Sequence, residues 1–313
     1  MAIKEYEKRR IRFFVSSQTV RRQRDDTPLA FLFFLPMAIF LLWFIYLPAT
    51  MSLILGFYHY HLLGVNTTFA GFANFADALT YPVFWIAFKN TLLYAAYMVP
   101  LTLVGAVGIA LLIDQKSHWY GMIRTFVLLP YITPVIATAI GWLWMFNPQY
   151  GILNAILRGL HLPQSQWLLS PAMAMPSVAL YSLWHGLGFN VVIVLSALGN
   201  MPRQLLEAAA LDGATKWQQF RYIILPLLSP TLYFLLIVTT IGTFQAFAPI
   251  YALSGGQGGP EYATTTLLLL IYQTAFQDFH FSYAAAMAML LVVIIFTLTL
   301  IQHQMAKRWV FYQ

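Results

Sequence analysis

Six long apolar runs constrain the fold of this chain more than any other feature of its sequence. They span roughly residues 28–57, 91–113, 126–146, 175–198, 229–253 and 283–302. A transmembrane α-helix needs about 20 apolar residues, whereas a β-barrel shows short alternating segments. Hydrophobic residues make up 60% of the chain and charged residues only 9%. The sequence therefore predicts an all-α, polytopic membrane helix bundle with six transmembrane helices.

The basic residues predict how this bundle is oriented. Of the 17 Lys and Arg residues, only Lys89 and Arg158 fall on one side of a six-span topology. Cytoplasmic loops are enriched in Lys and Arg, so both termini and the connection between the fourth and fifth spans are expected in the cytoplasm. The predicted organisation is a basic cytoplasmic tail at 1–27, a six-span domain at 28–303 and a second cytoplasmic tail at 304–313.

Several classes of partner and chemistry are disfavoured. The net charge of +7 is concentrated near the N-terminus, where it is expected to face anionic lipid or to hold the orientation, rather than to bind nucleic acid. The absence of cysteine excludes disulfides, thiolate catalysis and metal–thiolate sites. The outer connections, at 57–90, 147–174 and 254–282, are rich in Gly, Pro, Asn and aromatic residues. They are expected to form short interfacial helices that cap a central cavity.

A polar segment, EAAALDGATKWQQFRYIILPLLSP, runs from Glu207 to Pro230 between two apolar runs. Its first residues are strong helix formers, and the Asp212-Gly213 pair is a turn signal, so a helix-turn-helix along the inner membrane face is predicted. An apolar stripe (Trp217, Phe220, Ile224) is expected to rest on the bundle. Two prolines, Pro226 and Pro230, are expected to break the helix before the fifth span.

This segment resembles the EAA loop of binding-protein-dependent ABC importer permeases at every position of the family pattern. The matching positions are Glu207-Ala208-Ala209, Asp212-Gly213-Ala214, Phe220, Ile223, Leu225-Pro226 and Pro230. Shorter stretches at 69–75, 128–131, 146–148, 151–154 and 264–266 are similar to the sugar-uptake branch, which includes maltose, glycerol-3-phosphate and trehalose permeases. The resemblance implies the fold of a type I ABC importer permease over most of the chain.

The same resemblance implies the partners and the role of the loop. Two permeases, here this chain and a second homologous subunit, would pair with two ATPase subunits and receive a sugar from an extracytoplasmic solute-binding protein. The loop, at 201–228, would dock in a cleft on the ATPase. Glu207 would be the polar contact, Ala208 and Ala209 would permit close approach, and Gly213 would form the turn beside Asp212. The alternative is an ordinary amphipathic loop with a solvated Glu207.

Nucleotide chemistry is expected on another chain. Residues 253–257 spell LSGGQ, the signature of an ABC ATPase, but they fall at the outer end of the fifth span, and the chain has no G-x-x-x-x-G-K-[ST] loop to hold phosphates. A flexible glycine-rich corner is expected there. No catalytic or metal-binding residue is predicted, and ATP and Mg²⁺ would be bound by the partner ATPase.

The solute path is predicted from polar residues within the fourth and fifth spans. No Lys, Arg, Asp or Glu lies in the core of a predicted span, which disfavours proton coupling and favours a neutral polyhydroxylated solute. Helical spacing, together with the resemblance, places the candidates on one face of each span. They are Ser182, His185, Gly186, Phe189 and Asn190 on the fourth, and Thr239, Gly242, Thr243 and Gln245 on the fifth. For each of them, hydrogen bonding between helices is the competing role, and for Thr239 and Thr240 it is the favoured one.

Two other functions remain open at this stage. A secondary transporter or channel working alone would be supported by inverted repeats with matching broken helices, which the sequence does not show. An intramembrane enzyme is disfavoured by the lack of a catalytic constellation.

Overall fold

The computed structural model describes residues 27–60, 67–113 and 118–311, and the chain divides into two compact units, Met1–Ser52 and Leu53–Gln313. Apart from Thr27, the predicted N-terminal tail lies outside the described residues. The first predicted span is a single apolar helix built from α2 (Thr27–Leu41), the π-helical turn η1 (Leu42–Tyr46) and α3 (Leu47–Leu55). Its 25 residues from Phe31 to Leu55 suffice to cross a membrane.

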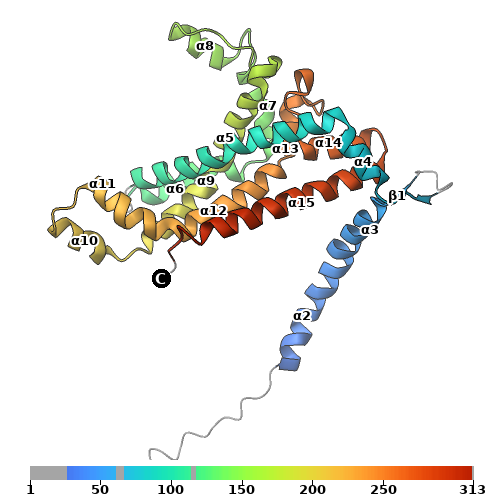
Figure 1. Ribbon diagram of the computed structural model, residues 1–313. Helices are drawn as coiled ribbons and strands as arrows, with labels where there is room; N and C mark the ends of the chain where they lie inside the picture. The colour runs from blue at the N-terminus through green and yellow to red at the C-terminus, as the bar shows by residue number, and fades with distance from the viewer. Residues whose placement is uncertain (1–26, 61–66, 114–117, 312–313) are drawn as a thin grey trace, which may run out of the picture. The chain divides into compact units, whose positions relative to one another are not determined.

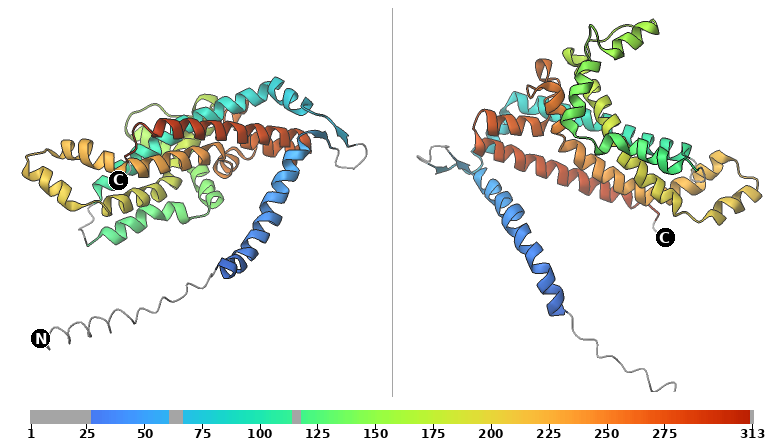
Figure 2. Two further views of the ribbon diagram at one scale, coloured as in Figure 1. Left: turned by 60° about the horizontal axis from the view of Figure 1, so that its bottom comes forward. Right: turned by 180° about the vertical axis from the view of Figure 1, so that it is seen from behind.

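Four further helices in the second unit are long and apolar enough to span a bilayer (Figures 1 and 2). They are α5 (Pro82–Leu112), α9 (Pro171–Gly199), the continuous helix Lys216–Phe244, and α15 (Phe281–Ala306). The described residues thus contain five candidate spans, or six if the pair α6 (Tyr120–Ile132) and α7 (Val135–Met145) counts as one. The all-α membrane architecture is confirmed.

The third predicted span, at 126–146, is broken. Helices α6 and α7 meet at an angle of 92°. Pro134 precedes α7, and the residue before a proline is pushed out of the helical region, as Thr133 is with ψ 147°. A hydropathy window detects the apolar composition of this stretch but not its change of direction.

Other span boundaries also differ from the prediction. Helix α5 begins at Pro82 rather than Thr91, and it therefore contains Lys89. The fifth span ends at Phe244 rather than Leu253, because the chain leaves the helix at Gln245 and starts the separate helix α13 (Ala248–Ser254), which has a proline in its first turn.

Pro226 and Pro230 were predicted to break the helix before the fifth span, but they do not interrupt it. The helix Lys216–Phe244 comprises α11 (Lys216–Gln219), the π-helical turn η3 (Phe220–Ile224) and α12 (Leu225–Phe244). In the π turn the backbone N–H of Leu225 donates to the carbonyl of Phe220, five residues back. This change of hydrogen-bond register accommodates Pro226, whose nitrogen has no proton to donate.

Short elements fill the three connections that were predicted to lie outside. The first contains a hairpin of β1 (Tyr58–His59) and β2 (Thr68–Phe69), followed by α4 (Ala73–Thr80). The second and third contain, in order, α8 (Ile152–Gly159), η2 (Trp167–Leu169), η4 (Pro260–Tyr262), α14 (Leu267–Tyr272) and η5 (Gln273–Gln277). The polar loop adds α10 (Arg203–Leu211). The β1 and α4 end and the α10 and α11 end lie at opposite ends of the long helices (Figures 1 and 2).

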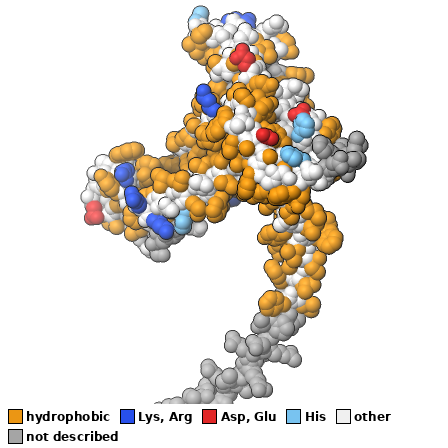
Figure 3. All heavy atoms as spheres, turned by 45° about the vertical axis from the view of Figure 1, so that its right-hand side comes forward, with side chains coloured by type: hydrophobic (Ala, Val, Ile, Leu, Met, Phe, Trp, Pro, Cys, Tyr) orange, Lys and Arg blue, Asp and Glu red, His pale blue; other side chains and the backbone are white. Residues whose placement is uncertain are grey.

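Side-chain packing fixes the long helices of the second unit against one another. Ala106 of α5, Val191 of α9 and Leu235 of α12 belong to one buried cluster. Helix α6 approaches α9 so closely that a Cβ at Gly188 would collide with the carbonyl of Val127. The outer surface is mostly apolar, and Lys and Arg side chains gather toward the α10 and α11 end (Figure 3).

Candidate functional site

One cavity of about 580 Å³ lies among α5, the α6–α7 bend, α9 and α12. All nine residues predicted for the solute path line it: Ser182, His185, Gly186, Phe189, Asn190, Thr239, Gly242, Thr243 and Gln245. The two polar faces that helical spacing identified therefore do converge on one space. We call this space the polar cavity.

On α9, the polar side chains of this face are partly committed to backbone groups. The Ser182 hydroxyl donates to the carbonyl of Val178 at 2.8 Å, and the Asn190 amide donates to the carbonyl of Gly186 at 3.0 Å. The His185 Nε2 atom lies 3.1 Å from the Thr133 carbonyl at the α6–α7 bend. The Asn190 carbonyl oxygen accepts no hydrogen bond within the described residues, so it is available to a hydroxyl in the cavity.

On α12, fewer of the side chains that face the cavity make hydrogen bonds within the described chain. The Thr243 hydroxyl donates to the carbonyl of Thr240 at 2.8 Å, whereas Gln245, at the end of the helix, is exposed and makes no side-chain hydrogen bond to the described part of the chain. A Cβ added at Gly242 would meet nothing within 4 Å, and the same is true of Gly186. Glycine at these two positions therefore leaves open space.

Thr240 makes a contact of a different kind. It is buried, and its hydroxyl accepts a hydrogen bond of 2.8 Å from Gln302 of α15. This bond joins two long helices and does not face the polar cavity.

A third wall of the cavity, and an aromatic residue at the α6–α7 bend, were not predicted from the sequence. Tyr94, Met98 and Thr102 line it from α5 at four-residue intervals, which is the spacing of one helix face. That spacing is visible in the sequence, but tyrosine and methionine are too common in apolar helices to stand out. The ring of Tyr131, from the end of α6, stacks on Phe189.

Among the described residues, those that line the polar cavity include no Lys, Arg, Asp or Glu. Its polar atoms are hydroxyl, amide and imidazole groups set among aromatic and aliphatic side chains. A pocket of this chemistry matches a solute rich in hydroxyl groups and provides no counter-charge for an ionic one. Among the described residues, no group of three or more His, Asp or Glu is arranged to hold a metal ion.

The residues predicted for coupling lie together beyond the C-terminal end of α9, on a helical hairpin formed by α10 and α11. Glu207, Ala208, Asp212 and Gly213 are exposed and Ala209 is half-buried. Gly213 has φ +80°, and the Ala214 N–H donates to the Ala209 carbonyl at 2.9 Å, closing a glycine turn at the end of α10. This conformation strains any residue with a Cβ.

The second helix of the hairpin starts with a capping box, because the Thr215 hydroxyl accepts from the Gln218 N–H while Gln218 accepts from the Thr215 N–H. Of the predicted apolar stripe, Phe220 and Ile224 are half-buried, but Trp217 is exposed rather than resting on the bundle. No residue of α10 is buried, and Leu211 is 90% exposed. The hairpin thus presents an uncovered surface, apolar and charged, at the end of the bundle.

The LSGGQ sequence lies at a glycine-rich turn. Gly255, Gly256, Gly258 and Gly259 all have positive φ, and the Thr264 N–H donates to the Gly258 carbonyl at 2.8 Å. A Cβ at Gly258 would collide with the Thr265 hydroxyl, and one at Gly259 would crowd that of Thr264. Gly258 and Gly259, which directly follow the LSGGQ sequence, therefore permit a close approach to Thr265 and Thr264, and within that sequence a Cβ at Gly256 would collide with the Tyr251 ring.

The chain matches the model of the family described as "Binding-protein-dependent transport system inner membrane component" over residues 106–310. It belongs to this family. The segment matched includes the α10 and α11 hairpin and most of the polar cavity. The chain is therefore a multi-pass membrane permease subunit of a binding-protein-dependent ABC importer.

Individual relatives align over most of their length. The lactose transport system permease protein LacF of Rhizobium radiobacter is 32% identical over 267 residues, covering 84% of this chain and 89% of LacF. The sn-glycerol-3-phosphate transport system permease protein UgpA of Yersinia enterocolitica is 33% identical and covers 88% of this chain and 92% of UgpA. Among solved structures, a bacterial alginate ABC transporter in complex with an alginate-bound periplasmic protein matches with a TM-score of 0.79 and 25% identity. This match covers 92% of this chain and 98% of the transporter chain.

Proposed function

We propose that this chain translocates a neutral sugar or a similar polyhydroxylated solute through the polar cavity. The relatives are named for lactose and for glycerol-3-phosphate, and the similar structure is an alginate transporter, so the solute class of the family includes neutral and acidic members. The observation that favours a neutral solute is the uncharged lining of the polar cavity. An acidic solute would lack a cationic partner on this subunit.

The proposed assembly contains a second homologous permease, two ATPase subunits and an extracytoplasmic solute-binding protein. ATP and Mg²⁺ are bound by the ATPase subunits, so this chain is not itself the enzyme. The exposed hairpin of α10 and α11, with Glu207, Ala208, Ala209, Asp212 and Gly213, supports a docking role for this end of the molecule. The similarity to a transporter solved with its periplasmic protein supports the binding-protein partner.

The connectivity of the hairpin supports a mechanical role. Helix α9 leads into α10, and α11 continues without a break into α12, so both helices that carry the predicted solute contacts are joined to the hairpin. The helix Lys216–Phe244 has 29 residues, which corresponds to roughly 40 Å at about 1.5 Å per residue. A rigid-body displacement of the hairpin, driven by closure of the ATPase, would therefore reach the polar cavity through covalently continuous helix.

The proposed orientation places the hairpin and both termini in the cytoplasm of a bacterial or archaeal inner membrane. The tails at 1–27 and 304–313 and the loop at 201–228 then share one side, and the six-span domain is 28–303. Exposed Arg203, Lys216 and Arg221 at the hairpin end agree with the positive-inside rule.

Purification and reconstitution test this function. The chain, expressed with its neighbouring genes and extracted in mild detergent, should co-purify with an ATPase and a second permease. In proteoliposomes that contain the cognate binding protein, uptake should require ATP and should favour a neutral oligosaccharide over a uronate or a sugar phosphate of similar size. ATP-independent transport by the isolated chain, or preferred uptake of the acidic solute, would overturn the proposal.

A further inference from the structure

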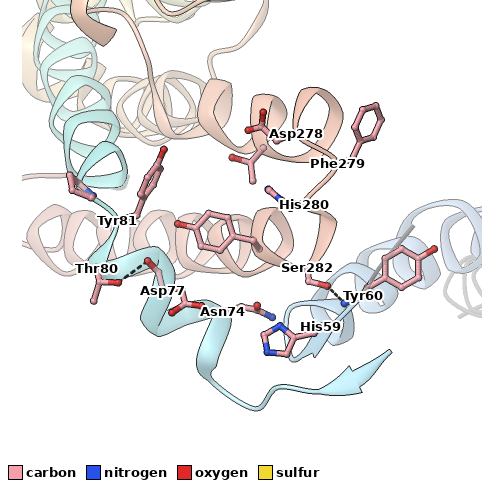
Figure 4. A pocket seen from close by; sticks show the side chains of 13 residues that line it. His59, Tyr60, Asn74, Asp77, Thr80, Tyr81, Asp278, Phe279, His280 and Ser282 are labelled. Carbon is pink, nitrogen blue, oxygen red and sulfur yellow. Dashed lines mark hydrogen bonds between the residues drawn. The ribbon is translucent and has the colours of Figure 1, made fainter. Parts of the chain in front are cut away.

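A second pocket, of about 720 Å³, lies at the end of the molecule opposite the hairpin (Figure 4). It is enclosed by β1, α4, the start of α5, and the turn that joins η5 to α15. It shares no lining residue with the polar cavity. On the proposed topology it opens on the extracytoplasmic side, and we call it the outer pocket.

The outer pocket is negatively charged. Asp77 of α4 and Asp278 of the turn before α15 both line it, and no Lys or Arg of the described part of the chain does (Figure 4). His59 and His280 also line the pocket, together with tyrosines. Two carboxylates in a concave site with no Lys or Arg among its described lining residues focus a field that attracts cations.

Two acceptor oxygens that reach the pocket from largely buried residues provide an independent observation. Asn74 is 4% exposed, and its amide nitrogen donates to the carbonyls of Gly56 and Tyr58 at 2.9 and 3.0 Å. These two bonds fix the orientation of the side chain, so its carbonyl oxygen is the acceptor left for the pocket, and it accepts nothing from the described residues. Thr274 is 5% exposed, lines the same pocket, and has a hydroxyl without a partner in the described chain. Both oxygens are open to the pocket and are therefore available to an N–H donor that enters it.

The other side chains that line the outer pocket favour an organic cation over a metal ion. Tyr81 and Tyr283 line the pocket with their ring centroids 6.3 Å apart, and Phe279 also faces it. Aromatic faces attract organic cations such as ammonium and guanidinium groups. A bare metal ion fits less well, because no group of three or more metal-ligating side chains is assembled within the described residues.

The pocket is held in shape by contacts among distant segments. The Tyr60 N–H donates to the Ser282 hydroxyl at 2.9 Å, which joins the β1 strand to α15 (Figure 4). The His280 N–H donates to the Thr274 carbonyl at 2.9 Å and closes the turn that carries Asp278 and Phe279. The carboxylates and the acceptors are therefore presented by a preformed scaffold.

We propose that the outer pocket binds an alkylammonium or guanidinium group. The carboxylates of Asp77 and Asp278 supply the counter-charge, the oxygens of Asn74 and Thr274 accept N–H donors, and the aromatic walls cover the alkyl stem. Two sources carry this chemistry: a free polyamine-like cation, and a Lys or Arg side chain of the extracytoplasmic binding protein. The second source depends on the partner assigned above as part of the proposed function.

The first arm of the test measures a free cation on the full transporter in lipid nanodiscs. Agmatine, which carries both groups, is titrated calorimetrically against wild type, the double variant Asp77→Asn with Asp278→Asn, and the isosteric Thr274→Val. The control is Glu261→Gln, which removes an acid from the same outer connection as Asp278 at a position that does not line the pocket. The double variant should bind agmatine at least about tenfold more weakly, equivalent to about 1.4 kcal/mol, and the control should match wild type.

The second arm measures the affinity of the binding protein for the same four transporters. If the cation is a side chain of that protein, the double variant should raise the Kd by at least about tenfold, and agmatine should compete with the protein. If the cation is free, agmatine should bind in the first arm while the Kd of the binding protein is unchanged in the variant. Either result supports the pocket chemistry. No agmatine binding and an equal Kd in all four transporters would overturn it, and ATP-driven solute uptake, measured in parallel, reports separately on the proposed function.

Discussion

The ring of Tyr131 stacks on that of Phe189, with centroids 4.9 Å apart and planes inclined by 20°. Tyr131 stands at the C-terminal end of α6, just before the bend, and Phe189 lies on the cavity face of α9. The pair therefore joins the broken span to the helix that carries the largest group of predicted solute contacts. Because both rings line the polar cavity, the stack forms part of the surface that a solute would meet.

Removing one ring should raise the KM for solute uptake without unfolding the bundle. Phe189→Ala removes an aromatic face from the cavity lining. A stacking contact of the solute with this ring would be worth about 0.5–1.5 kcal/mol, so its loss is expected to raise the KM for ATP-driven uptake in proteoliposomes by roughly 2- to 12-fold. Phe234→Ala is the matched control, because Phe234 is exposed on α12 and does not line the cavity. Equal kinetics in the two variants would show that the stack is remote from the solute path.

The open space beside Gly186 provides a steric test of the same cavity. A Cβ at this position meets nothing within 4 Å, so Gly186→Ala should be tolerated, whereas Gly186→Leu should fill the cavity. We expect the leucine variant to lose at least about 90% of solute uptake, equivalent to more than about 1.4 kcal/mol. Gly141→Leu, on α7 with equally open surroundings but outside the cavity lining, is the control. Normal uptake by Gly186→Leu would exclude this cavity as the route.

Sequence patterns located the helices and the two polar faces for a physical reason. Lipid-exposed helices must be apolar, so hydropathy detects them, and the period of 3.6 residues places Ser182, His185 and Phe189 on one side of α9. The same tools could not detect the bend at Thr133, because the apolar composition continues through it while the backbone direction changes.

Two other features depend on tertiary structure. The π-helical turn before Pro226 keeps the helix continuous through a residue that usually breaks one, and no simple sequence rule distinguishes the two outcomes. Asp77 and Asp278 are separated by 200 residues of sequence and line one pocket only because α4 packs on α15. Single-sequence periodicity contains no information on such a pairing.

Charge reversal on the hairpin should uncouple ATP hydrolysis from the solute. Glu207 is exposed on α10, and its proposed role is a polar contact to the ATPase, so Glu207→Lys should abolish solute-stimulated ATP hydrolysis in the reconstituted complex. Gln204→Lys places a lysine one turn earlier on the same exposed helix and should retain most of the stimulation. Membrane insertion of both variants, checked by yield in the membrane fraction, should be unchanged. Full stimulation with Glu207→Lys would contradict the coupling role.

The hydrogen bonds of Asn154 should keep the segment around α8 in its folded conformation. This side chain is 1% exposed; its amide nitrogen donates to the carbonyls of Pro148 and Ser165, and its oxygen accepts from the Ser165 N–H and the Trp167 indole. Asn154→Ala leaves these groups without their partner, at a cost of about 1–3 kcal/mol for each one that stays buried. Limited proteolysis of the reconstituted protein should therefore cut near α8 several times faster in Asn154→Ala than in wild type or in the exposed control Gln149→Ala. Because Asn154 lies far from the hairpin in the sequence and on a different element, solute-independent ATP hydrolysis should be unaltered, and unchanged cleavage rates would show that the loop is held by other contacts.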